Sequence, residues 1–160
     1  MVIDINHFDE NLPIYRNGTV EELLGKYAII RCATEIIKKQ QYSESLLNSA
    51  EFIGNKEEID VSDISKAANL GDKAALECFN LIGKYLGITI ASLANIFDIS
   101  NFIIGGGISQ SDIIINAARK ISKERSLPPV SARINVETAR YLNDTGIIGA
   151  ALLGKLEILK

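Results

Sequence analysis

Residues 101–110 read Asn-Phe-Ile-Ile-Gly-Gly-Gly-Ile-Ser-Gln, and this stretch decides how the rest of the chain is interpreted. A short run of branched apolar residues stops at three consecutive glycines, and a helical pattern with serine and aspartate as candidate N-caps follows at once. The pattern predicts a buried strand over Asn101–Ile104, a tight turn, and a helix from about Gln110 to Lys123.

The triplet Gly105, Gly106 and Gly107 allows two interpretations. Glycines permit positive φ angles and carry no β-carbon, so a flat ligand can lie against bare backbone beside the free N–H groups of the next helix. A plain tight turn could use the same residues. The stretch lacks both the dinucleotide pattern G-x-G-x-x-G and the Lys-Ser/Thr of a phosphate loop. A ligand bound here is therefore not expected to be held by its phosphates alone.

The bulk composition narrows the classes of protein. A length of 160 residues with 47% hydrophobic residues predicts one globular domain. The net charge is -3, and the lysines and arginines are scattered, so nucleic acid is not expected as a partner of this segment. No apolar run is expected to reach the roughly 18 residues of a membrane helix, and the chain does not open on a signal pattern. The sequence therefore predicts a cytoplasmic protein without a membrane partner.

Cysteine and histidine are few in this chain. Cys32 and Cys78 both fall on apolar stripes of predicted helices, which is typical of buried small hydrophobic residues rather than of a disulfide or a nucleophile. The single His7 is interpreted as a solvated loop residue. These three residues do not make a zinc site by themselves.

Apolar periodicity predicts an alternation of helices and strands along the chain. Helices are expected over residues 19–39, 43–52, 62–70, 73–97 and from about 145, and strands over residues 1–5, 101–104 and 132–136. Thr19 and Asp72 are the expected N-caps of the first and the longest helix, and Thr19 begins a capping-box pattern. The longest helix is apolar nearly all round at its C-terminal end, so it is expected to be buried against a sheet or another subunit. This order indicates an α/β layer.

Several segments, in this order, resemble the C-terminal half of the ROK family, which comprises bacterial sugar kinases, glucokinase among them, and sugar-responsive repressors. Gly18-Thr19-Val20-Glu21 resembles the family's G-C-x-E, and Asn69-Leu70-Gly71-Asp72-x-x-Ala75 resembles its A-x-x-G-D-x-x-A. The glycine stretch and the later Thr-Gly-Ile-Ile-Gly-Ala-Ala of residues 145–151 complete the set. The resemblance runs from about Gly18 to Leu153.

The resemblance implies an α/β fold of the actin-like (ribonuclease H-like) ATPase type, in which two domains close on a cleft where ATP and a hexose meet. In that family the glycine-rich loop holds the adenosine part of ATP, which implies nucleotide-binding roles for Gly105, Gly106 and Gly107, with Ile108 as neighbour. The glutamate of G-C-x-E contacts the sugar, which implies this role for Glu21. A structural role for Glu21 competes, because an acidic residue in the first turn of a helix is stabilised by about 0.3 to 1 kcal/mol.

The chain also departs from the family pattern. Leu12, Ile14 and Thr19 stand where the zinc motif C-x-C-G-x-x-G-C has three of its cysteines, so zinc is not expected. The family's phosphate loops, catalytic aspartate and sugar-contacting histidine all precede the point where Met1 aligns. No catalytic residue and no metal ligand is therefore assigned in this chain. Residues 1–160 are expected to form a single domain, the C-terminal, nucleotide-binding half of a ROK-type protein without its N-terminal lobe.

Three functional hypotheses follow. The first is the C-terminal part of an ATP-dependent hexose kinase, glucokinase-like, which would use ATP with magnesium in the complete enzyme and is not expected to be active alone. The second is the effector and dimerisation half of a sugar-responsive repressor, whose DNA-binding helices would lie upstream. The third is an α-rich dimerisation module that has lost ligand binding. A homodimer is expected, because the apolar end of the helix at 73–97 would otherwise face water.

Overall fold

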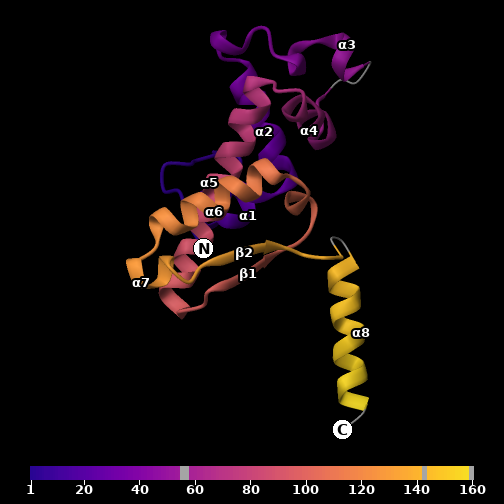
Figure 1. Cartoon of the computed structure of the whole chain (residues 1–160). Helices are drawn as coiled ribbons and strands as arrows, with labels where there is room; N and C mark the ends of the chain where they lie inside the picture. Colours follow the sequence, from indigo (N-terminus) through magenta and orange to yellow (C-terminus); the bar gives the residue numbers. More distant parts are fainter. Residues whose placement is uncertain (55–57, 142–143, 159–160) are drawn as a thin grey trace.

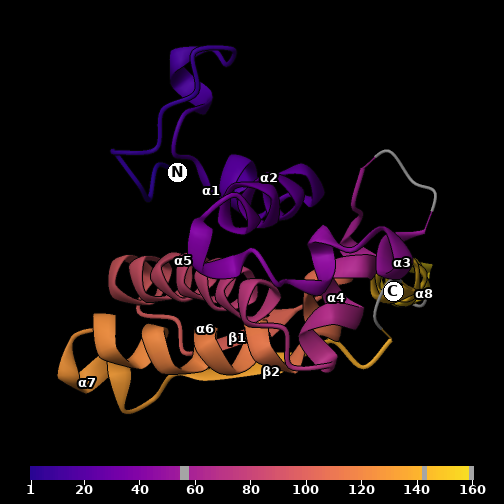
Figure 2. The ribbon, with the colours of Figure 1, turned by 90° about the horizontal axis from the view of Figure 1, so that it is seen from above.

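The long helix α5 (Lys73–Phe97) is the centre of the structure, a computed structural model that describes residues 1–54, 58–141 and 144–158. In Figure 2, α1 (Val20–Leu24) and α2 (Lys26–Ile37) lie on one side of α5, and α6 (Asp112–Arg125) lies on the other side together with the strands. The predicted α/β class is confirmed, although helices make up most of the described residues.

The N-terminus of α5 is fixed by one buried carboxylate. Asp72 accepts the backbone N–H of Ala75 at 2.9 Å, as expected of an N-cap. The same carboxylate accepts the hydroxyl of Ser45 at 3.1 Å and the N–H of Leu46 at 2.8 Å. Asp72 therefore both starts the helix and ties the preceding segment to it. The predicted bounds of α5 are confirmed at both ends.

Two glycines allow α5 and α6 to pack closely. A β-carbon built on Gly83 would lie 2.6 Å from Cβ of Ala117, and one on Gly87 would lie 2.7 Å from Cβ of Ile121. Both distances are too short for two carbon atoms. The two helix backbones can therefore come this close only because both positions are glycines, which have no β-carbon. The predicted helix after the glycine turn is confirmed as α6, which begins and ends two residues later than expected.

The two strands pair in parallel on the side of α6. The strand β1 (Asn101–Ile104) pairs with β2 (Asn135–Thr138), with Phe102 opposite Val136. The prediction of a strand at 132–136 was wrong by about three residues, because register follows the pairing with β1 rather than local alternation. Two prolines before β2 start the short helix α7 (Pro128–Ser131), since their fixed φ suits a first helical turn.

The helix predicted over 19–39 is in fact two helices. Gly25 has extended backbone angles (φ -70°, ψ 163°) and separates α1 from α2. Thr19 caps α1 by accepting the N–H of Glu22 at 3.4 Å, as predicted. The reciprocal half of the capping box is absent, because the Glu22 carboxylate pairs with Arg31 and the N–H of Thr19 binds the carbonyl of Arg16 at 3.2 Å.

The segment before α1 is a loop held by local hydrogen bonds and one contact to α5. The predicted strand at 1–5 was wrong, since only one antiparallel bridge forms there, between Val2 and Thr19. Gly18 has φ +65°, and a β-carbon on it would lie 1.8 Å from the carbonyl oxygen of Asp4, so only glycine fits. Asp4 in turn accepts the hydroxyl of Tyr85 at 2.9 Å, which ties the loop to α5. The loop contains the short 3-10 helix η1 (Ile14–Arg16).

Short elements connect α2 to α5. They are the 3-10 helices η2 (Gln40–Tyr42) and η3 (Leu46–Asn48), the helix α3 (Ala50–Ile53) and the helix α4 (Val61–Asn69). The single helix predicted over 43–52 was therefore wrong, while the helix predicted over 62–70 is confirmed as α4. Asp60 caps α4 by accepting the N–H groups of Ser62 and Asp63.

The last helix, α8 (Thr145–Ile158), stands apart from the body of the protein in Figure 1. Its side chains Ile147, Leu152 and Leu153 are exposed. A β-carbon on Gly146 or Gly149 would meet nothing within 4 Å, so no other described segment of the chain packs closely against the helix at these positions. The sequence offers Asn143 or Asp144 as the N-cap of this helix, and Asn143 lies outside the described residues.

One helix among the described residues, α5, is long and apolar enough to cross a membrane by length and composition, contrary to the expectation that no run would qualify. Most of that apolar stretch is buried within the protein, where it packs against α1, α2, α4 and α6. Its composition is accounted for by its central place in the hydrophobic core.

Candidate functional site

A cavity of about 700 Å³ opens at the carboxyl end of β1. Its walls come from α1, α2, α4, α5, the glycine turn and the start of α6. The lining residues are Leu24, Lys26, Ile29, Val61, Ser62, Ser65, Lys66, Phe79, Gly105, Gly107, Ile108, Gln110, Ser111 and Ile114. A cavity of this size, at the carboxyl end of a parallel strand, is typical of a small-molecule site in an α/β protein.

The glycine turn forms one wall of this cavity. Gly106 has φ 75° and ψ -168°, a conformation essentially restricted to glycine. Gly107 begins the 3-10 helix η4 (Gly107–Gln110), and the carbonyl of Gly106 accepts both the N–H of Ser109 at 3.2 Å and its hydroxyl at 2.7 Å. Ser109 is buried, and these two hydrogen bonds to Gly106 stabilise the turn.

The space beside the turn is open. A β-carbon on Gly106 or on Gly107 would meet nothing within 4 Å. Of the residues proposed for nucleotide binding, Gly105, Gly107 and Ile108 line the cavity, while Gly106 shapes the turn without being part of the wall. The backbone beside the cavity is therefore bare, which is the condition that a flat ligand needs.

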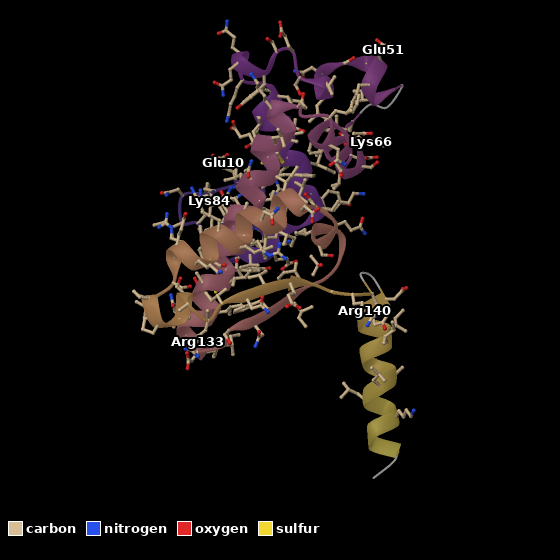
Figure 3. The ribbon with its side chains drawn as sticks, in the orientation of Figure 1. Glu10, Glu51, Lys66, Lys84, Arg133 and Arg140 are labelled. Atoms are coloured by element: carbon tan, nitrogen blue, oxygen red, sulfur yellow. The ribbon has the colours of Figure 1, made fainter. Side chains whose placement is uncertain are left out.

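The other walls of the cavity combine apolar side chains with a few polar groups. Leu24, Ile29 and Phe79 present apolar side chains from three different helices. Lys26 on α2 and Lys66 on α4 bring the cationic groups, and Figure 3 shows Lys66 on α4. Apolar walls suit a planar ring system, and ammonium groups suit an anionic substituent on it.

The contribution of α4 to this cavity was not predicted from the sequence. Ser62, Ser65 and Lys66 all line the cavity, and their spacing of three and four residues places them on one face of that helix. This spacing was visible in the sequence. The sequence did not show that this face of α4 is directed toward a glycine turn some forty residues later.

Glu21, the predicted sugar contact, does not line this cavity. Its side chain is 82% exposed and pairs with Arg16 at 3.5 Å. The next residue, Glu22, is the buried one, at 6% exposure, and pairs with both Arg31 and Arg16. Arg31 also donates to the backbone carbonyl of Glu22 at 3.2 Å. The structure therefore places the predicted sugar contact and the glycine turn in separate surroundings.

Leu12, Ile14 and Thr19, which replace three cysteines of the zinc motif, have no metal-binding side chains. In the described part of the chain, no group of three or more histidine, cysteine, aspartate or glutamate side chains could hold a metal ion. Ile14, at one of the former cysteine positions, is an exposed apolar residue, and Thr19 caps α1. The expectation that zinc is not bound stays a prediction.

Comparison with known proteins gives this fold a family. The model of the ROK family matches residues 16–157. A glucokinase of Halalkalibacterium halodurans is 29% identical over 141 residues, which cover 88% of this chain and 42% of that protein. The DNA-binding transcriptional repressor Mlc of Escherichia coli is 29% identical over 94 residues, which cover 58% of this chain and 23% of that protein.

Solved structures show the same relationship. A ROK family glucokinase from Streptomyces griseus, in complex with glucose and AMPPNP, superposes with a TM-score of 0.73 and 28% identity, over 86% of this chain and 44% of its own. A ROK family transcriptional regulator, a homologue of the Escherichia coli Mlc protein, superposes with a TM-score of 0.72 and 25% identity, over 97% of this chain and 37% of its own. The predicted actin-like ATPase fold is thereby confirmed, and this chain spans less than half the length of these relatives. The chain belongs to the ROK family.

Proposed function

We propose that this chain is the nucleotide-binding, C-terminal part of an ATP-dependent hexose kinase of the glucokinase type. The observation that carries the proposal is the glycine turn, whose bare backbone at Gly105 and Gly107 faces a cavity of about 700 Å³. The similarity to a glucokinase solved with glucose and AMPPNP supports it. In this proposal the complete enzyme transfers a phosphoryl group from ATP to a sugar hydroxyl in the cytoplasm.

In the proposed complex the adenosine part of ATP lies along the backbone of Gly105, Gly106 and Gly107, with Ile108 beside it. The apolar walls exclude water from the ring, and Lys26 and Lys66 attract the charged phosphates toward the open side. Magnesium would shield the phosphate charge in the complete enzyme. No catalytic base is assigned in this chain, zinc is not expected, and Glu21 is proposed to contact the sugar from the exposed face of α1.

Titration with AMPPNP tests nucleotide binding directly. Gly107→Ala adds one methyl group to the cavity wall, and its backbone φ is not in the positive range, so the fold should tolerate the change. We expect this methyl to displace a ligand lying against the backbone and to weaken binding by roughly tenfold, equivalent to about 1.4 kcal/mol. Gly149→Ala in α8, where an added β-carbon meets nothing within 4 Å, is the matched control and should bind as the unmodified chain does. Absence of heat up to millimolar AMPPNP, or unchanged binding by Gly107→Ala, would contradict the proposed site.

The activity of this chain alone is a separate question. Phosphoryl transfer needs a base and a phosphate cradle, and neither is assigned here. We therefore expect no ATP-dependent phosphorylation of glucose by the 160-residue chain. Substantial turnover would show that catalytic groups lie within these residues.

A second function, the effector half of a sugar-responsive repressor, is supported by the Mlc homologue, which superposes over 97% of this chain. In both functions we propose a homodimer. Hexose binding that needs no nucleotide, together with no affinity for AMPPNP, would favour the repressor.

A further inference from the structure

Two cysteines occupy the contact between α2 and α5. Cys32 on α2 is half-buried and lines a small cavity of about 150 Å³, together with His7, Glu35 and Tyr85. Cys78 on α5 is fully buried, and neither cysteine takes part in a disulfide. The sequence indicated only small hydrophobic residues at these positions, and their mutual placement depends on how the two helices pack.

The side chains of the two cysteines are neighbours. The thiol of Cys78 donates to the backbone carbonyl of Ile29 at 3.5 Å, and Ile29 lies one helical turn before Cys32 on α2. Cys32 also shares its cavity with Glu77, Leu81 and Ile82, which flank Cys78 on α5, so the two cysteines lie at the same point of the contact between the helices. Ala33 and Ala75, the neighbours of these positions on the two helices, are fully buried, and such small residues let the helix backbones approach. A disulfide needs β-carbons about 3.5–4.5 Å apart, a separation that requires two helix backbones to pack closely.

The surroundings make the two thiols unequal. The neighbouring Cys78 side chain lowers the pKa of Cys32, against the opposing effects of burial and of the Glu35 carboxylate. The neighbouring Cys32 side chain and burial raise the pKa of Cys78. Because the thiolate is the form that reacts with oxidants, and because Cys32 borders a cavity, Cys32 is the cysteine that a small oxidant reaches first.

We propose that Cys32 and Cys78 form an intramolecular disulfide on exposure to a peroxide, which links α2 to α5. In the first step the Cys32 thiolate attacks one oxygen of hydrogen peroxide, the O–O bond breaks, and sulfenic acid and, after protonation, one water are formed. In the second step the Cys78 thiol attacks the sulfenic sulfur, the S–O bond breaks, and a second water leaves with the thiol proton. Two thiols are oxidised and one peroxide is reduced. The linked helices supply Ile29 and Phe79 to the large cavity, so the disulfide would restrain two of its walls.

Peptide mass spectrometry of the peroxide-treated chain tests this proposal. Trypsin cleaves after Arg31, Lys38, Lys73 and Lys84, so the disulfide should join the peptide of residues 32–38 to that of residues 74–84, with the loss of two hydrogen atoms. Reduction with dithiothreitol should release both peptides. Peroxide-treated protein that keeps two alkylatable thiols, carries sulfinic acid on Cys32 beside a free Cys78, or forms only disulfides between two chains would overturn the proposal.

Two variants separate the roles of the cysteines. In Cys78→Ala, peroxide should leave a sulfenic acid on Cys32 that dimedone traps, because no second thiol condenses with it. In Cys32→Ser, the buried Cys78 should stay reduced under the same treatment. Circular dichroism should show that each variant is folded, and the linked peptide of the unmodified chain tests the disulfide even if a variant is not. Oxidation of Cys78 in Cys32→Ser as fast as oxidation of Cys32 in Cys78→Ala would contradict the assigned order.

Discussion

Glu21 and Glu22 are adjacent residues of the same type, yet their side chains have different surroundings and different roles. Both stand in the first turn of α1, where the helix dipole favours a carboxylate. Glu21 points to solvent, whereas Glu22 is buried and satisfied by Arg31 and Arg16. The carboxylate of Glu22 therefore has a structural role, and that of Glu21 is available for a ligand.

Neutralising each glutamate should separate these roles. We expect Glu22→Gln to lower the free energy of unfolding by about 1.5–3 kcal/mol, since a buried residue loses charge-assisted hydrogen bonds. Glu21→Gln should change it by less than about 0.5 kcal/mol, as is usual for an exposed side chain. Urea unfolding of both variants checks this difference. Equal stability of the two variants would show that the Glu22 ion pairs contribute nothing net.

At the scale of elements, the packing of α5 on α6 depends on two residues without side chains. Gly83 and Gly87 face Ala117 and Ile121 at distances where a β-carbon does not fit. Glycine within an exposed helix would cost about 0.5–1 kcal/mol relative to alanine. In α5 that local cost is offset by the close approach of two helices.

Alanine substitution at Gly83 should therefore be destabilising, against the usual helix preference. The added methyl group overlaps the Ala117 side chain and the backbone of Ile114, and such overpacking costs about 1–3 kcal/mol. The control is Gly149→Ala in α8, where nothing lies within 4 Å and the substitution should be neutral or slightly stabilising. Thermal unfolding of the two variants gives the comparison. A Gly83→Ala protein as stable as the control would mean that α5 and α6 can separate without cost.

A second link between elements responds to pH. Glu77 on α5 accepts the hydroxyl of Tyr42 and the ammonium of Lys39, the latter at 3.0 Å, and these hydrogen bonds lower its pKa from the ordinary value of 4.5 against a smaller effect of burial. Because the pKa is lower in the folded state, this link contributes stability above pH 4.5. The contribution is lost as the pH falls through the folded-state pKa, which lies below 4.5.

Glu77→Gln should therefore be less stable than the unmodified chain at neutral pH and should approach it as the pH falls below 4.5. The effect should be modest, since the Glu77 side chain is 38% exposed and solvent screens the pair. Urea unfolding at several pH values measures the convergence. The exposed Glu51 of α3, labelled in Figure 3, offers a control, because Glu51→Gln removes the same charge from another element. Parallel stability curves for Glu77→Gln and the unmodified chain would contradict the assignment.

At the scale of the whole molecule, the end of α5 and the helix α8 both expose apolar side chains. Ile96 and Phe97 are exposed at the end of α5, and α8 extends from the body with Ile147, Leu152 and Leu153 exposed. Apolar surface of this kind is typical of association sites. The proposed homodimer would cover part of it.

Sedimentation velocity at micromolar concentration should show a species of twice the 17.5 kDa mass of one chain. Leu153→Asp should shift the distribution toward the single chain, because a carboxylate on the exposed face of α8 opposes burial there. Lys84→Glu, an exposed charge change on α5, is the control and should leave the distribution unchanged. A single 17.5 kDa species for the unmodified chain would refute the dimer.

The sequence by itself determined the features that depend on neighbouring residues. Asp72 caps α5, Asn101–Ile104 forms a strand and Gly106 takes a turn that other residues avoid, because each follows from local hydrogen bonding or backbone freedom. The order of these motifs was also enough to indicate the ROK family.

Only the tertiary structure decided which residues meet. It set the register of β2 against β1, buried Glu22 rather than Glu21, and placed Lys66 of α4 on the same cavity as the glycine turn. It also brought Cys32 and Cys78 to the same contact between α2 and α5. Each of these depends on side chains far apart in sequence, whose contacts are chosen by the packing of the whole core. No local sequence pattern predicts these contacts, because the apolar face of a helix can pack against any of several neighbouring elements.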